Sequence, residues 1–137
     1  MQIIMLVGPP GAGKTTYVKN HRHEGDCQVD MDLIPRDWPQ RERRYARKTL
    51  LLRANTSPSP SVCWFSTAAP TREQRAYWRS FVSISQTIIL LPPLEIALER
   101  QIARDGRTHL TTLVPMWYEK YDEPDQTEPN TCVIPVT

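Results

Sequence analysis

Short apolar runs alternate along the chain with longer stretches whose apolar residues recur at the spacing of helical turns. The apolar runs predict strands at residues 3–7, 27–31, 62–65, 87–91 and 132–136. The stretches between them predict helices at residues 14–21, 39–53, 72–82, 94–104 and 114–121. Apolar strands that alternate with helices are typical of a parallel sheet covered on both faces. The sequence therefore predicts an α/β fold of three layers with a mostly parallel sheet of about five strands.

Turn and capping residues mark several of these boundaries. Thr71, with Gln74 three residues later, has the spacing of a capping box at a helix start. Pro39 suits the first turn of the second predicted helix. Pro135 lacks the N–H that a central strand needs, so we expect the last strand at an edge of the sheet. The residues from Asp122 onward, with their prolines and acids, predict an ordered but irregular tail.

The turn between the first predicted strand and the first predicted helix carries the most specific motif. Residues 8–15 read Gly-Pro-Pro-Gly-Ala-Gly-Lys-Thr and match the phosphate-binding P-loop, G-x-x-x-x-G-K-[ST]. The glycines let backbone N–H groups wrap around a phosphate, and the helix start adds the positive end of its dipole. Lys14 is predicted to reach the β- and γ-phosphates, and the Thr15 hydroxyl to ligate Mg²⁺. The residues predicted to bind the nucleotide are Gly8, Gly11, Ala12, Gly13, Lys14, Thr15 and Thr16.

Length and cysteine content narrow the class of protein. At 137 residues the chain is predicted to form one domain, residues 1–137. Cys27, Cys63 and Cys132 are widely spaced and form no C-x-x-C pair, so we expect neither zinc nor a disulfide framework. No charged leader and no apolar run of membrane-spanning length is present. These features predict a soluble protein of the reduced cytoplasm, and they leave the oligomeric state open.

Positive charge gathers in one segment although the net charge is only +2. Between residues 36 and 53 the only acids are Asp37 and Glu42, and the basic residues are Arg36, Arg41, Arg43, Arg44, Arg47, Lys48 and Arg53. Such a segment suits binding to a polyanion such as a nucleic acid. It is equally typical of a solvated helix face. Both interpretations stay open at this point.

Two carboxylates, Asp30 and Asp32, follow the second predicted strand. Ligands of parallel sheets bind outside the carboxyl ends of the strands, so this pair is expected beside the P-loop. We predict that Asp32 deprotonates an acceptor hydroxyl and that Asp30 holds Mg²⁺ together with Thr15. The alternative is that the pair only caps a turn or a helix.

The third predicted strand ends without an acid, which argues against a motor ATPase. Ser66 and Thr67 stand there instead, and Thr67 is predicted to contact the substrate. Arginines recur after the fourth strand, at Arg100, Arg104 and Arg107. A guanidinium stabilises the negative charge of a phosphoryl group in transit. Arg104 and Arg107 are therefore predicted as catalytic residues of a lid at about residues 104–112, in preference to Arg100.

On these residues the chain resembles the P-loop kinases of the polynucleotide-kinase type. The matching pieces are the P-loop, the Asp-Met-Asp-Leu-Ile-Pro-Arg stretch at 30–36, the Arg-Asp-Gly-Arg lid at 104–107, and the aromatic segment at 117–124. The resemblance implies transfer of the γ-phosphate of ATP, with Mg²⁺, to a hydroxyl of DNA or RNA. It also implies that Arg36 binds an acceptor phosphate and that the lid arginines bind ATP.

The compact form of the chain leaves the phosphate acceptor open. It resembles small phage kinases, some of which phosphorylate modified bases such as 5-hydroxymethyluracil in DNA, which implies the host cytoplasm as location. A kinase for a small molecule, such as a nucleoside or a nucleotide-sugar, is the first alternative. The second is a non-catalytic ATP-binding module.

Overall fold

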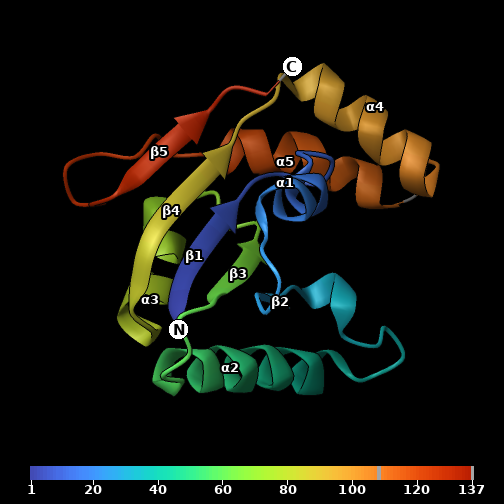
Figure 1. The fold of residues 1–137 in the computed structure, drawn as a ribbon. Helices are drawn as coiled ribbons and strands as arrows, with labels where there is room; N and C mark the ends of the chain where they lie inside the picture. Colours follow the sequence, from blue (N-terminus) through green and yellow to red (C-terminus); the bar gives the residue numbers. More distant parts are fainter. Residues whose placement is uncertain (108, 137) are drawn as a thin grey trace.

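The computed structural model describes residues 1–107 and 109–136, whose strands form one sheet (Figure 1). The strands are β1 (Gln2–Val7), β2 (Cys27–Val29), β3 (Val62–Thr67), β4 (Ile84–Leu90) and β5 (Thr131–Ile134). The α-helices are α1 (Lys14–His21), α2 (Gln40–Thr56), α3 (Arg72–Phe81), α4 (Leu94–Asp105) and α5 (Leu113–Lys120), and the 3₁₀ helices are η1 (Met31–Leu33) and η2 (His109–Thr112). The strand order is β2-β3-β1-β4-β5, and each neighbouring pair is parallel. The predicted α/β fold is confirmed.

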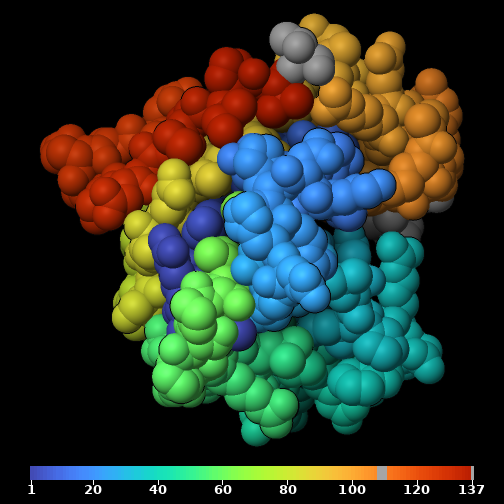
Figure 2. Space-filling model, viewed as in Figure 1, coloured from blue at the N-terminus to red at the C-terminus, as the bar shows by residue number. Residues whose placement is uncertain are grey.

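The two faces of the sheet bury different sets of residues because side chains alternate along each strand. The odd-numbered residues of β1 join α2, α3 and α5 in one apolar cluster, which includes Ile3, Met5, Val7, Leu51, Trp78 and Trp117. The even-numbered residues pack with Val18 of α1 in a second, smaller cluster. In Figure 2, atoms of β1 and β4 remain visible beside α1, so this helix covers only part of its face. The predicted three-layer arrangement is confirmed.

Most predicted boundaries agree with the structure to within a few residues. The capping box is formed, since Thr71 Oγ1 accepts from the Gln74 N–H at 3.1 Å and Gln74 Oε1 accepts from the Thr71 N–H at 3.2 Å. β4 begins at Ile84 rather than at residue 87. A β-bulge at this point and the polar residues Ser85 and Gln86 hide the apolar pattern there, although the backbone is paired with β1. β5 lies at an edge of the sheet, as Pro135 predicts.

A buried ion pair holds the C-terminal segment against α3. The Arg75 side chain is fully buried and donates to Glu128 Oε1 at 2.7 Å and Oε2 at 3.0 Å. Arg79 donates to the same carboxylate at 2.6 Å. Burial alone would raise the pKa of Glu128, but the hydrogen bonds from the two arginines outweigh it and hold the pKa below its usual range. The ion pairs of Glu128 with Arg75 and Arg79 therefore anchor the predicted irregular tail to helix α3.

We expect Glu128→Gln to lower the free energy of unfolding by about 3–5 kcal/mol, because it leaves the Arg75 guanidinium buried without a counter-charge. Asp125→Asn is the matched control, since its pair with Arg72 is solvent-exposed and should contribute far less. Urea denaturation of both variants measures the difference. Equal losses in the two variants would show that the buried pair is not what anchors the tail.

Candidate active site

The P-loop joins the end of β1 to α1 at the carboxyl edge of the sheet (Figure 1). Gly11 and Gly13 have φ angles of +81° and +91°, in the left-handed region that glycine tolerates. A Cβ on Gly11 would lie 2.3 Å from the carbonyl oxygen of Ala97 in α4. A Cβ on Gly8 would lie 3.0 Å from the carbonyl oxygen of Leu90. Glycine is thus what allows the loop backbone to sit directly against α4 and the end of β4.

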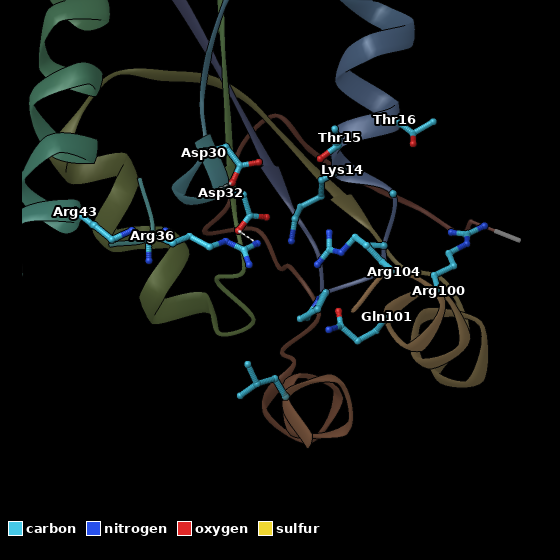
Figure 3. Close-up of a pocket in the computed structure, with 15 residues that line it drawn as sticks. Lys14, Thr15, Thr16, Asp30, Asp32, Arg36, Arg43, Arg100, Gln101 and Arg104 are labelled. Carbon is cyan, nitrogen blue, oxygen red and sulfur yellow. Dashed lines mark hydrogen bonds and ion pairs between the residues drawn. The ribbon is translucent and has the colours of Figure 1, made fainter. Parts of the chain in front are cut away.

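A cavity of about 640 Å³ opens beside this loop (Figure 3). The residues predicted from the sequence that line it are Gly11, Ala12, Gly13, Lys14, Thr15, Thr16, Asp30, Asp32, Arg36 and Arg104. The cavity is also lined by residues that were not predicted for the site, among them Arg43, Arg100, Gln101 and Leu113. The P-loop, the carboxylate pair and arginines from two separate elements therefore face one common space.

Lys14 is half-buried at the P-loop with its ammonium turned toward backbone oxygens. Its Nζ donates to the Gly8 carbonyl oxygen at 2.6 Å. Burial lowers the pKa of Lys14 to about 8, although the negative charges of Asp30 and Asp32 act in the opposite direction, and Arg104 adds to the decrease. A bound phosphate would add negative charge next to this amine and favour its charged form.

The two carboxylates at the end of β2 differ in their surroundings. Asp30 caps η1, with its Oδ1 accepting from the Asp32 N–H at 2.9 Å. Burial, with the nearby Asp32 charge, raises the pKa of Asp30, and Lys14 and Arg104 oppose this increase. The Asp32 side chain is more than half exposed and lies 4.0 Å from Arg36. Asp30 therefore does cap a turn, as the structural alternative predicts, and both carboxylates in addition line the cavity opposite Lys14.

Arg43 fixes the wall of the cavity that carries the carboxylates. It projects from α2, and its Nη2 donates to the Met31 carbonyl oxygen at 2.7 Å. This bond ties α2 to η1, the turn between Asp30 and Arg36. The only sequence signal for this role is the position of Arg43 within the basic segment.

Helix α4 contributes the opposite wall. Arg100, Gln101 and Arg104 line the cavity from this helix, and Arg104 Nε donates to Asp105 Oδ2 at 3.1 Å. Gln101 is one turn beyond the buried Ala97, and a polar residue on the apolar face of the helix is the sequence signal that identifies it.

Three predicted residues, Gly8, Thr67 and Arg107, are not part of the described lining of the cavity. Arg107 is exposed, so the placement favours Arg100 over Arg107, the reverse of the predicted order. Thr67 ends β3, and its carbonyl oxygen accepts from the Gly8 N–H at 3.3 Å. The predicted lid begins within α4 and continues into η2, and its residue Thr108 lies outside the described residues.

Several residues of the basic segment contact the protein itself. The Arg47 guanidinium lies 4.7 Å from the centre of the Trp78 ring, and the Lys48 ammonium lies 5.2 Å from that of Tyr77. Arg43 is bound to η1 as described. These contacts favour the interpretation of α2 as a structural helix surface over that of a continuous site for a polyanion.

Two further properties concern the part of the chain that the structure describes. Within it, no group of three or more His, Cys, Asp or Glu side chains is arranged to hold a metal ion. No helix among residues 1–107 and 109–136 combines the length and the apolar character needed to cross a membrane.

Comparison with known proteins shows the fold. No protein-family model and no curated protein sequence matches the chain. Among solved structures it is similar to a gluconokinase from Sinorhizobium meliloti 1021, with 18% identity, a TM-score of 0.66, and coverage of 98% of this chain and 82% of that one. A sugar kinase from Janibacter sp. HTCC2649 gives 17% identity and a TM-score of 0.65, covering 98% of this chain and 85% of that one.

A shikimate kinase from Bacteroides thetaiotaomicron is also similar, with 17% identity, a TM-score of 0.57, and coverage of 87% of this chain and 78% of that one. The chain therefore has the fold of the P-loop kinases, as the resemblance implies. None of these three structures is named as a polynucleotide kinase, so that narrower resemblance stays a prediction.

We expect Gly11→Ala to destabilise the protein clearly more than Gly106→Ala. Both positions have a positive φ, so both variants carry the strain of a left-handed conformation. Only Gly11 faces the Ala97 carbonyl oxygen at 2.3 Å, whereas among the described residues no atom beyond the chain neighbours of Gly106 lies within 4 Å of a Cβ there. Thermal unfolding of the two variants measures this, and equal melting temperatures would contradict the seating of the loop against α4.

We expect the affinity for ATP, the predicted ligand of this loop, to fall as the pH rises above about 8. The free site then loses the Lys14 ammonium, whereas bound phosphate favours the protonated form. The dissociation constant should rise by up to about tenfold per pH unit above that pKa. Isothermal titration calorimetry between pH 7 and pH 9.5 measures it. Lys14→Arg keeps its charge over this range, so a rise of equal size in that variant would exclude Lys14 as its cause.

Proposed function

We propose that this protein is an ATP-dependent kinase that transfers the γ-phosphate to a hydroxyl of a small acceptor molecule. The single observation that carries the proposal is the shared cavity. Lys14 at the P-loop, the Asp30–Asp32 pair and the α4 arginines Arg100 and Arg104 face it from three separate elements. A module that only binds a nucleotide needs the loop but not a carboxylate pair on the far side of the lysine.

The nucleotide end of the cavity is formed by the P-loop and α4. The N–H groups at the start of α1 bind the phosphates together with the hydroxyls of Thr15 and Thr16. Lys14 exchanges its backbone carbonyl partner for phosphate oxygens. Arg104 stabilises the negative charge that spreads over the phosphoryl group in transit.

The acceptor end is formed by η1 and its flanking residues. Asp32 accepts the proton of the acceptor hydroxyl while the hydroxyl oxygen bonds to the γ-phosphorus and the bond from that phosphorus to the bridging oxygen of ADP breaks. Arg36, on the same wall, binds an anionic group of the acceptor. The roles of Asp32 as base and of Asp30 on the metal side are those predicted from the sequence.

The residues present fit Mg²⁺. The Thr15 hydroxyl and the Asp30 carboxylate are hard oxygen donors that line the same cavity, and Mg²⁺ in such sites takes few protein ligands beside phosphate oxygens and water. When bound, Mg²⁺ neutralises phosphate charge. Burial is the chief cause of the raised pKa of Asp30, and a neighbouring cation would lower that pKa again.

Two observations support a small acceptor over a nucleic acid. The basic residues Arg43, Arg47 and Lys48 contact the protein itself. The similar structures are named for gluconate, sugar and shikimate kinases. A nucleic-acid hydroxyl, which the polynucleotide-kinase resemblance implies, is the second candidate.

An acceptor screen with labelled ATP tests the proposal. We expect label to transfer to at least one small hydroxy acid or sugar acid, and not to DNA or RNA with 5′-hydroxyl ends or to DNA that contains 5-hydroxymethyluracil. Label in the nucleic acids alone would show that the acceptor is a nucleic acid and not a small molecule. ATP binding without transfer to any acceptor would support the non-catalytic alternative and overturn the proposal.

In the same assay, we expect Asp32→Asn to lower kcat by about 10²- to 10⁴-fold with little change in ATP affinity, because it removes the base but not the phosphate cradle. Asp37→Asn is the matched control, since Asp37 is exposed and is not part of the described lining. Lys14→Ala should lose ATP binding itself. An Asp32→Asn variant with unchanged kcat would exclude Asp32 as the base.

A further inference from the structure

Gln101 is a buried polar residue whose position has no structural explanation in the core. It lies on the inner side of α4, one turn after Ala97, and only 1% of its surface is exposed. Apolar side chains are the ordinary occupants of such a position. Gln101 also lines the cavity beside the P-loop.

The amide of Gln101 is held from one side only. Its Nε2 donates to Asp105 Oδ2 at 2.9 Å. Its Oε1 is buried, and among residues 1–107 and 109–136 it has no hydrogen-bond partner. An ionised carboxylate can only accept hydrogen bonds, so Asp105 requires the nitrogen of the amide to face it, and this fixes the direction of the oxygen.

Asp105 also orients a second residue of the cavity. The same oxygen, Oδ2, accepts from Arg104 Nε at 3.1 Å. One carboxylate at the end of α4 therefore fixes both the arginine predicted to act on the phosphates and the amide of Gln101.

The geometry of the cavity limits what can pair with the free oxygen. In Figure 3 the Gln101 amide projects from α4 into the cavity, and Asp32 and Arg36 lie on the opposite side. The unpaired atom is an acceptor, so its partner must be a hydrogen-bond donor. The oxygens of a fully ionised phosphate chain have no proton to donate, whereas hydroxyl groups do.

We propose that Gln101 determines specificity for the phosphate acceptor. Its Oε1 accepts a hydrogen bond from a second hydroxyl of a polyhydroxylated acceptor, whose reacting hydroxyl faces Asp32, and Asp105 is the positioning residue for this amide. The proposal rests on the kinase function proposed above. It explains a buried, half-satisfied amide that the fold does not need, because a ligand hydroxyl completes its hydrogen bonds.

Gln101→Leu separates this role from a structural one. Leucine has a similar size. It removes the unpaired buried oxygen together with the hydrogen bond to Asp105, which keeps Arg104 as a donor, so the two effects offset and the variant should melt close to the wild type. We expect its kcat/KM for the acceptor found in the screen to fall about tenfold or more, with the KM for ATP within about twofold. The loss should disappear for an analogue of that acceptor that lacks the second hydroxyl, since wild type and variant should use it equally poorly.

A second variant tests the positioning role of Asp105. Gln101→Glu keeps an acceptor oxygen at this place but sets two carboxylates against each other, so Asp105 no longer fixes the direction of that oxygen. We expect it to lose acceptor kcat/KM.

The outcomes distinguish the two levels of proposal. A wild-type protein that phosphorylates no acceptor refutes the kinase function. An active wild type with unchanged acceptor kcat/KM in Gln101→Leu refutes only the role of Gln101. A rise in the KM for ATP instead would assign the amide to a ribose or base donor of the nucleotide and overturn the acceptor assignment.

Discussion

The close approach of the P-loop to helix α4 is the constraint on which the site depends. Because Gly11 has no side chain, its backbone lies against the Ala97 carbonyl oxygen, and any larger residue would push the two apart. The contact sets the position of the next turn of α4, which carries Arg100, Gln101 and Arg104. The absence of a Cβ at Gly11 thus sets the position of the P-loop relative to helix α4.

Two charged groups that line the cavity, Lys14 and Asp30, are held in surroundings that disfavour their charge. Burial lowers the pKa of Lys14 and raises the pKa of Asp30, so each group is less inclined to carry its charge than in water. Their attraction opposes burial at both positions but does not cancel it. Under the proposed function, a polyphosphate would favour the charged lysine and a divalent cation would favour the ionised carboxylate. The electrostatics are those expected of a site that binds both together.

The fold, the P-loop and the carboxylates after β2 follow from local sequence signals, and the residues that reach the cavity through tertiary packing do not. Apolar runs give the strands, and the P-loop motif gives Lys14 together with the start of α1 at its observed residue. Arg43 and Gln101 reach the cavity through tertiary packing, since one comes from α2 and the other from the inner face of α4. Helical spacing marks Gln101 as a polar residue on an apolar face, but spacing along the chain does not show that either residue reaches the cavity. Arg107 is the opposite case. Its place in an arginine-rich stretch predicted a site residue, but it is not part of the described lining of the cavity.

The end of β3 holds neighbouring elements together through its backbone carbonyl oxygens. Four successive carbonyl oxygens there are bonded to other elements: Thr67 to the Gly8 N–H, Ala68 to the Trp117 indole at 2.7 Å, and Ala69 and Pro70 to the Arg75 guanidinium. This segment joins the P-loop, α5 and α3, and its position is set by those three contacts. An acid at this strand end would bring a third carboxylate to the edge that already holds Asp30 and Asp32, where repulsion would further raise the pKa of Asp30. The end of β3 therefore has a structural role, and the proposed function relies on the carboxylates in the turn after β2.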